Sequence, residues 1–212
     1  MKITVYCLKG SAGKTPIAVN IALERGYALG TNEPYNLLDK LISKERFVSI
    51  EPSEAFPDLP PEVDIVFDLA GMMSREGHKS IISAVKQSDV VLVPIYNELK
   101  CINAGIHTIR ELQEQGATVV VVATKLQKQS GEGFTDWRDS RDFQNIKLVL
   151  DEVLGDNIPV LPLKFSKVFD TIFEKEASIN QIMASDGLAR YTYAEIAQQF
   201  DDLLSYLEKN YA

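Results

Sequence analysis

Seven consecutive residues near the N-terminus have the composition of a phosphate-binding loop. The segment is Lys9-Gly10-Ser11-Ala12-Gly13-Lys14-Thr15, and it lies between an apolar run, 3–8, and an amphipathic run, 16–23. Small residues let main-chain N–H groups curl around phosphate oxygens, and the N-terminus of a following helix adds positive potential. Lys14 would reach the β- and γ-phosphates, and the Thr15 hydroxyl would ligate Mg²⁺. This order predicts a nucleoside triphosphate site, the alternative being a chance loop that contains Gly-Lys-Thr.

An acidic residue at the end of another apolar run is the second candidate for this chemistry. Asp68-Leu69-Ala70-Gly71 follows residues 63–67, which have the pattern of a buried strand. Asp68 at the carboxyl end of that strand would hold Mg²⁺ through water, and the Gly71 N–H would sense the γ-phosphate. The alternative is an acid that only caps the next segment. The loop at 9–15 makes the metal role the preferred hypothesis.

Apolar runs alternate with helical patterns along the whole chain. Several of the runs are continuous, as expected for strands that helices cover on both faces. The expected strands are 3–8, 27–31, 47–50, 63–69, 90–95, 119–123 and 160–163, and the expected helices are 16–25, 35–44, 78–87, 103–115, 145–154 and 192–210. This alternation predicts an α/β fold, a doubly wound, mostly parallel sheet with helices on both faces. Residues 127–141 are polar and are the best candidate for a mobile loop.

The composition is that of an ordinary globular domain, expected to span residues 1–212. Of the 212 residues, 45% are apolar and 25% are charged. No apolar run approaches the length of a membrane span and no signal-peptide pattern is present, so a cytoplasmic location is expected. Cys7 falls in the first expected strand, and without a C-x-x-C pair no structural zinc is expected. The net charge of −8 argues against nucleic acid covering the whole surface, but it allows a local basic patch.

The loop at 9–15 resembles the deviant Walker A motif, K-G-G-x-G-K-[ST], of the ParA/MinD family of P-loop ATPases. Ser11 stands where that family has its second glycine, and Pro16 replaces a second Thr or Ser that contacts the α-phosphate. Proline fits the first helical turn but removes one N–H that could face the phosphates. The resemblance implies that residues 9–16 bind ATP and that Thr15 and Asp68 hold Mg²⁺.

Three later segments extend the resemblance. Thr31-Asn32-Glu33-Pro34-Tyr35 aligns with D-x-D-P-Q, whose second acid helps to place the attacking water, so this role falls on Glu33. The alternative for this segment is a plain helix-entry turn. Thr124 and Lys125 stand where relatives place residues beside the adenine. Pro162 and Leu163 lie on the strand whose following loop closes over the base.

The resemblance also implies a homodimer that forms with ATP. In the family, the first lysine of the motif reaches the partner's phosphates, and this role falls on Lys9. A cation supplied in trans stabilises charge on the β- and γ-phosphates, as an arginine finger does. Lys9, Lys14, Glu33 and Asp68 are therefore the expected catalytic residues of a slow ATPase.

The chain resembles the small ParA-type plasmid partition ATPases, which lack an N-terminal helix-turn-helix. These proteins segregate DNA, which they bind nonspecifically, and a centromere-binding ParB-like partner stimulates their ATP hydrolysis. Lys125, Lys128, Lys164 and Lys167 are the candidates for DNA contact. No membrane binding is expected, because the final helix is acidic and its apolar stripe is expected to pack on the sheet.

Three other functions remain open at the level of sequence. A ParA-like ATPase could position a protein or assist conjugation, without DNA as cargo. A metabolic enzyme similar to dethiobiotin synthetase also has a Gly-Lys-Thr loop, but it does not need Lys9. Thr31, Glu33 and Pro16 would also suit a pseudo-ATPase that binds the nucleotide without hydrolysing it.

Overall fold

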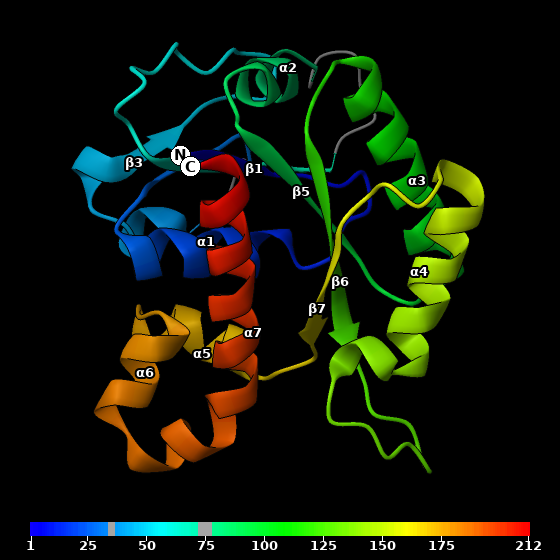
Figure 1. Ribbon diagram of the computed structural model, residues 1–212. Coiled ribbons are helices and arrows are strands. Elements are labelled where there is room, and N and C mark those ends of the chain that lie inside the picture. Colours follow the sequence, from blue (N-terminus) through cyan, green and yellow to red (C-terminus); the bar gives the residue numbers. More distant parts are fainter. Residues whose placement is uncertain (34–36, 72–77) are drawn as a thin grey trace.

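Seven parallel strands form one sheet, in the spatial order β3-β2-β4-β1-β5-β6-β7 (Figure 1). The computed structural model describes residues 1–33, 37–71 and 78–212. The strands are β1 (Lys2–Val5), β2 (Ala28–Thr31), β3 (Phe47–Ser49), β4 (Ile65–Asp68), β5 (Val90–Ile95), β6 (Val119–Leu126) and β7 (Val160–Lys164). All seven expected strands are present. The prediction of a doubly wound, parallel α/β fold is confirmed.

Helices cover both faces of this sheet (Figure 1). The α-helices are α1 (Lys14–Arg25), α2 (His78–Lys86), α3 (Leu99–Glu114), α4 (Arg141–Leu154), α5 (Val168–Lys175), α6 (Ile179–Ser185) and α7 (Gly187–Tyr211). The short 3₁₀ turns in the described residues are η1 (Leu38–Lys40), η2 (Lys44–Arg46) and η3 (Trp137–Asp139). No helix in the described part of the chain is long and apolar enough to cross a membrane.

Two hydrophobic cores lie on opposite faces of the sheet. In β6, Val120 and Val122 pack with α1, α5, α6 and α7, whereas Val121 and Ala123 pack with α2, α3 and α4. Successive strand residues point to opposite faces, so a strand covered on both sides is apolar at every position. This is why several strands appear in the sequence as continuous apolar runs.

Helix α1 is fixed at both ends by glycines in the left-handed region. Gly13 precedes it with φ of 99°, and Gly26 follows it with φ of 68° and donates its N–H to the Ala22 carbonyl. Glycine adopts this conformation without the steric cost that a Cβ imposes. The helix therefore starts directly at Lys14, the lysine of the phosphate-binding motif.

The long C-terminal helix packs as predicted. Residues 196, 197, 200, 203, 204 and 207 of α7 are buried in the core that also contains α1. The helix begins earlier than expected, because the Asp186 side chain accepts hydrogen bonds from the N–H groups of Leu188 and Ala189. Helix α4 likewise begins at Arg141, where Ser140 accepts from the Phe143 N–H.

The predicted helix over 35–44 is wrong. Its described residues contain the turn η1 and the first residue of the turn η2, and Ser43 between them is extended with φ of −59° and ψ of 148°, so no α-helix spans the segment. Residues 34–36, including Pro34 and Tyr35, lie outside the described residues. Helices α5 and α6 were not predicted, because segments of eight and seven residues give little periodicity. Residues 127–141 include η3, and hydrogen bonds join Gln127 and Gln129 to Asp142 of α4.

Candidate nucleotide-binding site

The segments singled out from the sequence meet at the carboxyl edge of the sheet. Strand β4 lies between β2 and β1, and Asp68 pairs in register with Thr31 on one side and Val5 on the other. The loops after these three strands therefore emerge side by side. Ligands in doubly wound folds bind at this edge.

A cavity of about 420 Å³ opens between the loop at residues 9–15 (the phosphate-type loop), β6 and α5. Its size falls within the usual range for small-molecule sites. The predicted residues that line it are Gly10, Ser11, Gly13, Lys14, Thr15, Pro16, Glu33, Thr124, Lys125 and Leu163. The structure thus brings together most of the residues that the sequence placed in one nucleotide site.

Four predicted residues do not line this cavity. Ala12 is buried, and its carbonyl accepts a hydrogen bond from the Thr124 hydroxyl at 2.9 Å. Lys9, the first residue of the loop, is half-buried, and Asp68 is buried next to Thr15. Pro162 lines a separate cavity together with Leu161, whereas Leu163 lines this one.

Two residues of the loop have a left-handed backbone conformation. Ser11 has φ of 60° and Gly13 has φ of 99°, so both lie in the left-handed region. This conformation explains why the family has glycine at the position of Ser11, because a residue with a Cβ raises the conformational free energy there by about 1–2 kcal/mol. The Thr124 hydroxyl holds the loop from β6, where a bulge between Ala123 and Leu126 interrupts the strand pairing.

Lys14 is a buried cation that lacks a carboxylate partner among the described residues. The residue is only 7% exposed, and its Nζ donates to the Lys9 carbonyl at 3.3 Å. Burial of an ammonium group is costly unless an anion lies nearby. Asp68 is near enough for Lys14 to lower its pKa, and phosphate oxygens in the cavity would supply an anion in direct contact.

Asp68 is the complementary buried anion. It is 1% exposed, and neither carboxylate oxygen has a hydrogen-bond partner among the described residues. Burial raises the pKa of Asp68 to about 6, and the Glu33 carboxylate adds to the increase. Thr15 and Lys14 act in the opposite direction. The Thr15 hydroxyl is thus close enough to lower this pKa, although it makes no hydrogen bond of ordinary geometry with the carboxylate.

The donor set at Asp68 and Thr15 fits Mg²⁺. This ion prefers oxygen ligands and is commonly held by one or two carboxylates together with substrate phosphates. An orphaned carboxylate beside a hydroxyl, below a cavity lined by the phosphate-type loop, is such an arrangement. Within the described ranges, no group of three or more His, Cys, Asp or Glu residues is arranged to hold a metal by protein side chains alone.

Gly71 lies against Cys7 and Leu8, which connect β1 to the loop at residues 9–15. A Cβ at this position would come within 2.6 Å of the Leu8 carbonyl oxygen and 2.8 Å of the Cys7 carbonyl oxygen. Main-chain atoms cannot yield as a flexible side chain can. Only glycine permits this approach, and it brings the Gly71 main chain to the cavity wall.

Asn32 connects the loops at the cavity, a role that no sequence pattern indicated. It is fully buried, its Oδ1 accepts from the Ala70 N–H at 2.7 Å, and its Nδ2 donates to the Ser80 hydroxyl at 2.8 Å. The residue after β2 is thereby tied to the loop after β4 and to α2. Its position between Thr31 and Glu33 was visible in the sequence, but its partners are distant along the chain.

The loop after β7 and helix α5 supply further residues that were not predicted individually. Phe165, Ser166, Phe169 and Asp170 line the cavity together with Lys125. The Lys125 ammonium also lies 4.6 Å from the centre of the Tyr96 ring. Aromatic rings and an aliphatic stem at this end of the cavity can accommodate the flat face of a base.

A parallel sheet in this order, with a lysine-containing glycine loop after β1, defines the P-loop ATPase fold of the MinD and ParA type. Solved structures of this type match nearly the whole chain at low sequence identity. McdA from Cyanothece is 13% identical with a TM-score of 0.65, over 97% of this chain and 98% of that one. The cell division ATPase MinD from Pyrococcus furiosus is also 13% identical, with a TM-score of 0.62 over 95% and 99%.

A third match is a putative plasmid partition protein from Borrelia burgdorferi B31. It is 14% identical with a TM-score of 0.55, over 94% of this chain and 98% of that one. No protein-family model matches the chain, and no curated protein sequence matches it. The likeness to these structures therefore establishes the fold.

Proposed function

We propose that the chain is a Mg²⁺-dependent ATPase that switches between monomer and homodimer, in the manner of ParA and MinD proteins. The observation that carries this proposal is the buried carboxylate of Asp68, which has no hydrogen-bond partner among the described residues. It lies next to Thr15, below a cavity lined by the phosphate-type loop. A buried, unpaired carboxylate is costly in the absence of a cation, and a bound metal removes that cost.

Each residue in the cavity has a defined role in this proposal. The N–H groups of the loop and the Lys14 ammonium bind the phosphates, and Asp68 with Thr15 holds the metal. Mg²⁺, when bound, neutralises charge on the β- and γ-phosphates. Glu33 lines the cavity and lies near enough to Asp68 to raise its pKa, so its carboxylate can orient a water molecule.

Lys9 supports the dimeric part of the proposal. It is the first residue of the loop and does not line the cavity of its own chain. A lysine in this position can reach the phosphates of a second copy, where it neutralises charge in trans. Turnover without a partner is expected to be slow, about 10⁻⁴ to 10⁻² per second, as in unassisted NTPases.

The ligands of the structural neighbours agree with this assignment. One McdA structure is an ATP complex, and MinD from Pyrococcus horikoshii OT3 was solved with Mg-ADP. The Borrelia protein carries AMPPNP. MinD from Aquifex aeolicus was solved in complex with MinC, a different protein. These observations support nucleotide binding and a protein partner for the present chain.

The direct test measures the mass of the protein in solution with ADP, ATP and an unhydrolysable ATP analogue. We expect a dimer with the analogue, and a monomer with ADP. Lys9→Ala should abolish the dimer while nucleotide affinity remains, whereas the exposed Lys100→Ala variant should behave like the wild type. A monomer under all three conditions would contradict the switch. ATP binding without any effect of Lys9→Ala would favour a metabolic enzyme.

The cargo is a separate question, and the contacts of the candidate lysines support a protein rather than DNA. Three of the four lysines considered for DNA contact have internal partners. The Lys164 ammonium pairs with Glu195, the Lys125 ammonium lies over Tyr96, and the Lys128 ammonium lies over Phe134. The formal charge of −8 also opposes binding to a polyanion.

We therefore place a positioning ATPase with a protein partner ahead of a plasmid partition ATPase with DNA as cargo. The measurement is DNA binding by fluorescence anisotropy with the ATP analogue, at increasing salt. Little binding at physiological salt is expected. A steep, salt-sensitive signal that requires ATP would reverse this order in favour of partition.

A further inference from the structure

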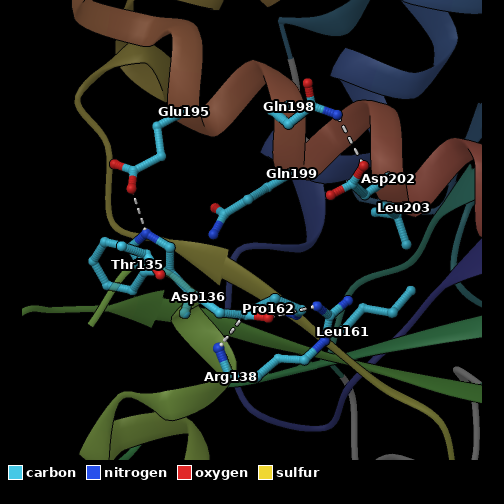
Figure 2. A pocket seen from close by; sticks show the side chains of 11 residues that line it. Thr135, Asp136, Arg138, Leu161, Pro162, Glu195, Gln198, Gln199, Asp202 and Leu203 are labelled. Atoms are coloured by element: carbon cyan, nitrogen blue, oxygen red, sulfur yellow. Dashed lines mark hydrogen bonds and ion pairs between the residues drawn. The ribbon is translucent and has the colours of Figure 1, made fainter.

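A second cavity, of about 390 Å³, lies beside β7 and is separate from the nucleotide site (Figure 2). Three segments that are distant in the sequence form its walls: the η3 turn, β7 and α7. Leu161, Pro162 and Leu203 provide an apolar floor. None of the chemistry proposed above uses this cavity.

Gln199 projects from α7 into this cavity (Figure 2). The residue is 8% exposed, and its Oε1 accepts from the Lys164 N–H at 2.8 Å. Its Nε2 is buried and has no hydrogen-bond partner among the described residues. An unpaired buried N–H is energetically unfavourable, and an acceptor on a ligand would remove that cost.

The position of Gln199 at the edge of the sheet indicates what kind of acceptor it takes. Strand β7 is the last in the sheet and pairs with β6 alone in the described part of the chain. The Gln199 amide oxygen accepts a hydrogen bond from the Lys164 N–H, as a carbonyl of a neighbouring strand would. The Gln199 amide N–H is available to donate a hydrogen bond in the same way. A main-chain carbonyl continues this pattern, since edge strands bind extended peptides. Pro162 lacks an N–H, so pairing along β7 itself can only be short.

The charges around the cavity favour a basic ligand. Its lining contains the carboxylates of Asp136, Glu195 and Asp202, against the single guanidinium of Arg138. Arg138 pairs with Asp136, and Glu195 accepts from the Trp137 indole at 2.7 Å and pairs with Lys164. Asp202 is exposed and accepts only from the Gln198 amide among the described residues. Asp202 is therefore the carboxylate best placed to receive a cation.

We propose that this cavity binds an extended peptide segment of a partner protein, with a basic side chain next to an apolar one. Its main-chain carbonyl accepts from Gln199 Nε2, its apolar side chain lies on Leu161 and Leu203, and its cation faces Asp202. The site requires no nucleotide, so it can be tested independently of the ATPase proposal.

The experiment selects peptides from a random phage-displayed library against the full chain, without nucleotide. Binding of the selected peptides, made synthetically, is then read from the fluorescence of Trp137, the only tryptophan in the chain and a residue of the cavity wall. The expected peptides share a basic residue next to an apolar one and change this fluorescence. Failure to select any peptide, or selection of peptides without this pair, would overturn the proposal.

Matched variants locate the binding. Gln199→Leu should weaken the peptide about tenfold, the value of one hydrogen bond. Asp202→Asn should weaken it about fivefold, as for an exposed ion pair. Asp201→Asn is the control, because Asp201 is adjacent on α7 but bonds Asn180 and does not line the cavity. If Gln199→Leu does not fold, comparison of the Asp201→Asn and Asp202→Asn variants still tests whether the peptide binds in this cavity. Equal affinities for the Asp201→Asn and Asp202→Asn variants would contradict the site.

Discussion

Burial gives Asp68 a free-energy cost that only a cation or a proton removes. Its pKa is about 6, against an ordinary value of 3.8. The folded state therefore binds more protons than the unfolded state between these two values. Stability of the unliganded protein falls as the pH rises through this window, and the cost at neutral pH is about 3 kcal/mol.

The first prediction follows from the loss of stability that ionisation of Asp68 causes. Without Mg²⁺, Asp68→Asn should stabilise the protein by up to about 3 kcal/mol at neutral pH and by little near pH 4. Urea unfolding at several pH values measures this difference. The same variant should lose the additional stabilisation that Mg-ATP gives the wild type.

An exposed acid serves as the control for Asp68. Asp156→Asn should change stability by less than about 0.5 kcal/mol at every pH. If Asp68→Asn destabilises the unliganded protein at neutral pH, the carboxylate has a structural partner and the metal-site argument is wrong.

The second prediction concerns the backbone of the loop. Ser11 and Gly13 both have positive φ, so their substitutions should have opposite effects. Ser11→Gly relieves strain and should stabilise by about 1 kcal/mol or less, because the more flexible unfolded chain offsets part of the gain. Gly13→Ala should destabilise by more than about 1 kcal/mol. Thermal unfolding of both variants checks this, and a shift in the same direction would refute it.

Among the elements, β2, β4 and α2 are joined at the site by one buried side chain. Asn32, the residue before Glu33, accepts a hydrogen bond from the Ala70 N–H and donates one to the Ser80 hydroxyl. That hydroxyl in turn donates to the Pro52 carbonyl at 3.0 Å. The loop that carries Glu33 and the loop that carries Gly71 are therefore held in a fixed relation. We regard Asn32 as a positioning residue.

The third prediction tests this link. Asn32→Ala leaves the buried Ala70 N–H unpaired and should destabilise the protein by about 1–3 kcal/mol. If Asn32 also positions Glu33, turnover should fall several-fold more than ATP affinity does. Turnover and nucleotide affinity are measured separately, with the exposed Asn97→Ala variant as the control. Equal losses in both quantities would leave Asn32 with a structural role only.

For the molecule as a whole, the net charge of −8 affects how two copies meet. Like charges repel over roughly a Debye length, about 10 Å at 0.1 M salt, and added salt screens that repulsion. Binding to DNA depends on salt in the opposite way, because it releases counterions. The salt response therefore distinguishes association of two copies from binding to a polyanion.

The fourth prediction uses that difference. Moderate added salt should strengthen, or at least preserve, the dimer formed with the ATP analogue. Sedimentation velocity at increasing potassium chloride measures the dimer fraction. A steep loss of dimer with salt would mean that contacts between opposite charges dominate the interface.

The sequence alone determined where the strands lie and that the loop at residues 9–15, which contains Lys14, lies between a strand and a helix. Residues 90–95 and 119–123 are apolar at every position because the sheet is covered on both faces, and Gly13 and Lys14 act through local backbone geometry. Such features depend on residues close together in the chain. The incorrect helix over 35–44 shows the limit, since its described residues form only short 3₁₀ turns on either side of the extended Ser43.

Only the tertiary structure decided which distant residues share the site. It placed Asp68 between Thr31 and Val5, left its carboxylate without a partner among the described residues, and tied Asn32 to Ala70. It also placed Pro162 and Gln199 around a second cavity. Burial and long-range hydrogen bonds arise from packing between elements, so they cannot be seen in local sequence patterns. The positions of the strands and of the glycine-containing loop were therefore predictable, whereas the buried environment of Asp68 was not.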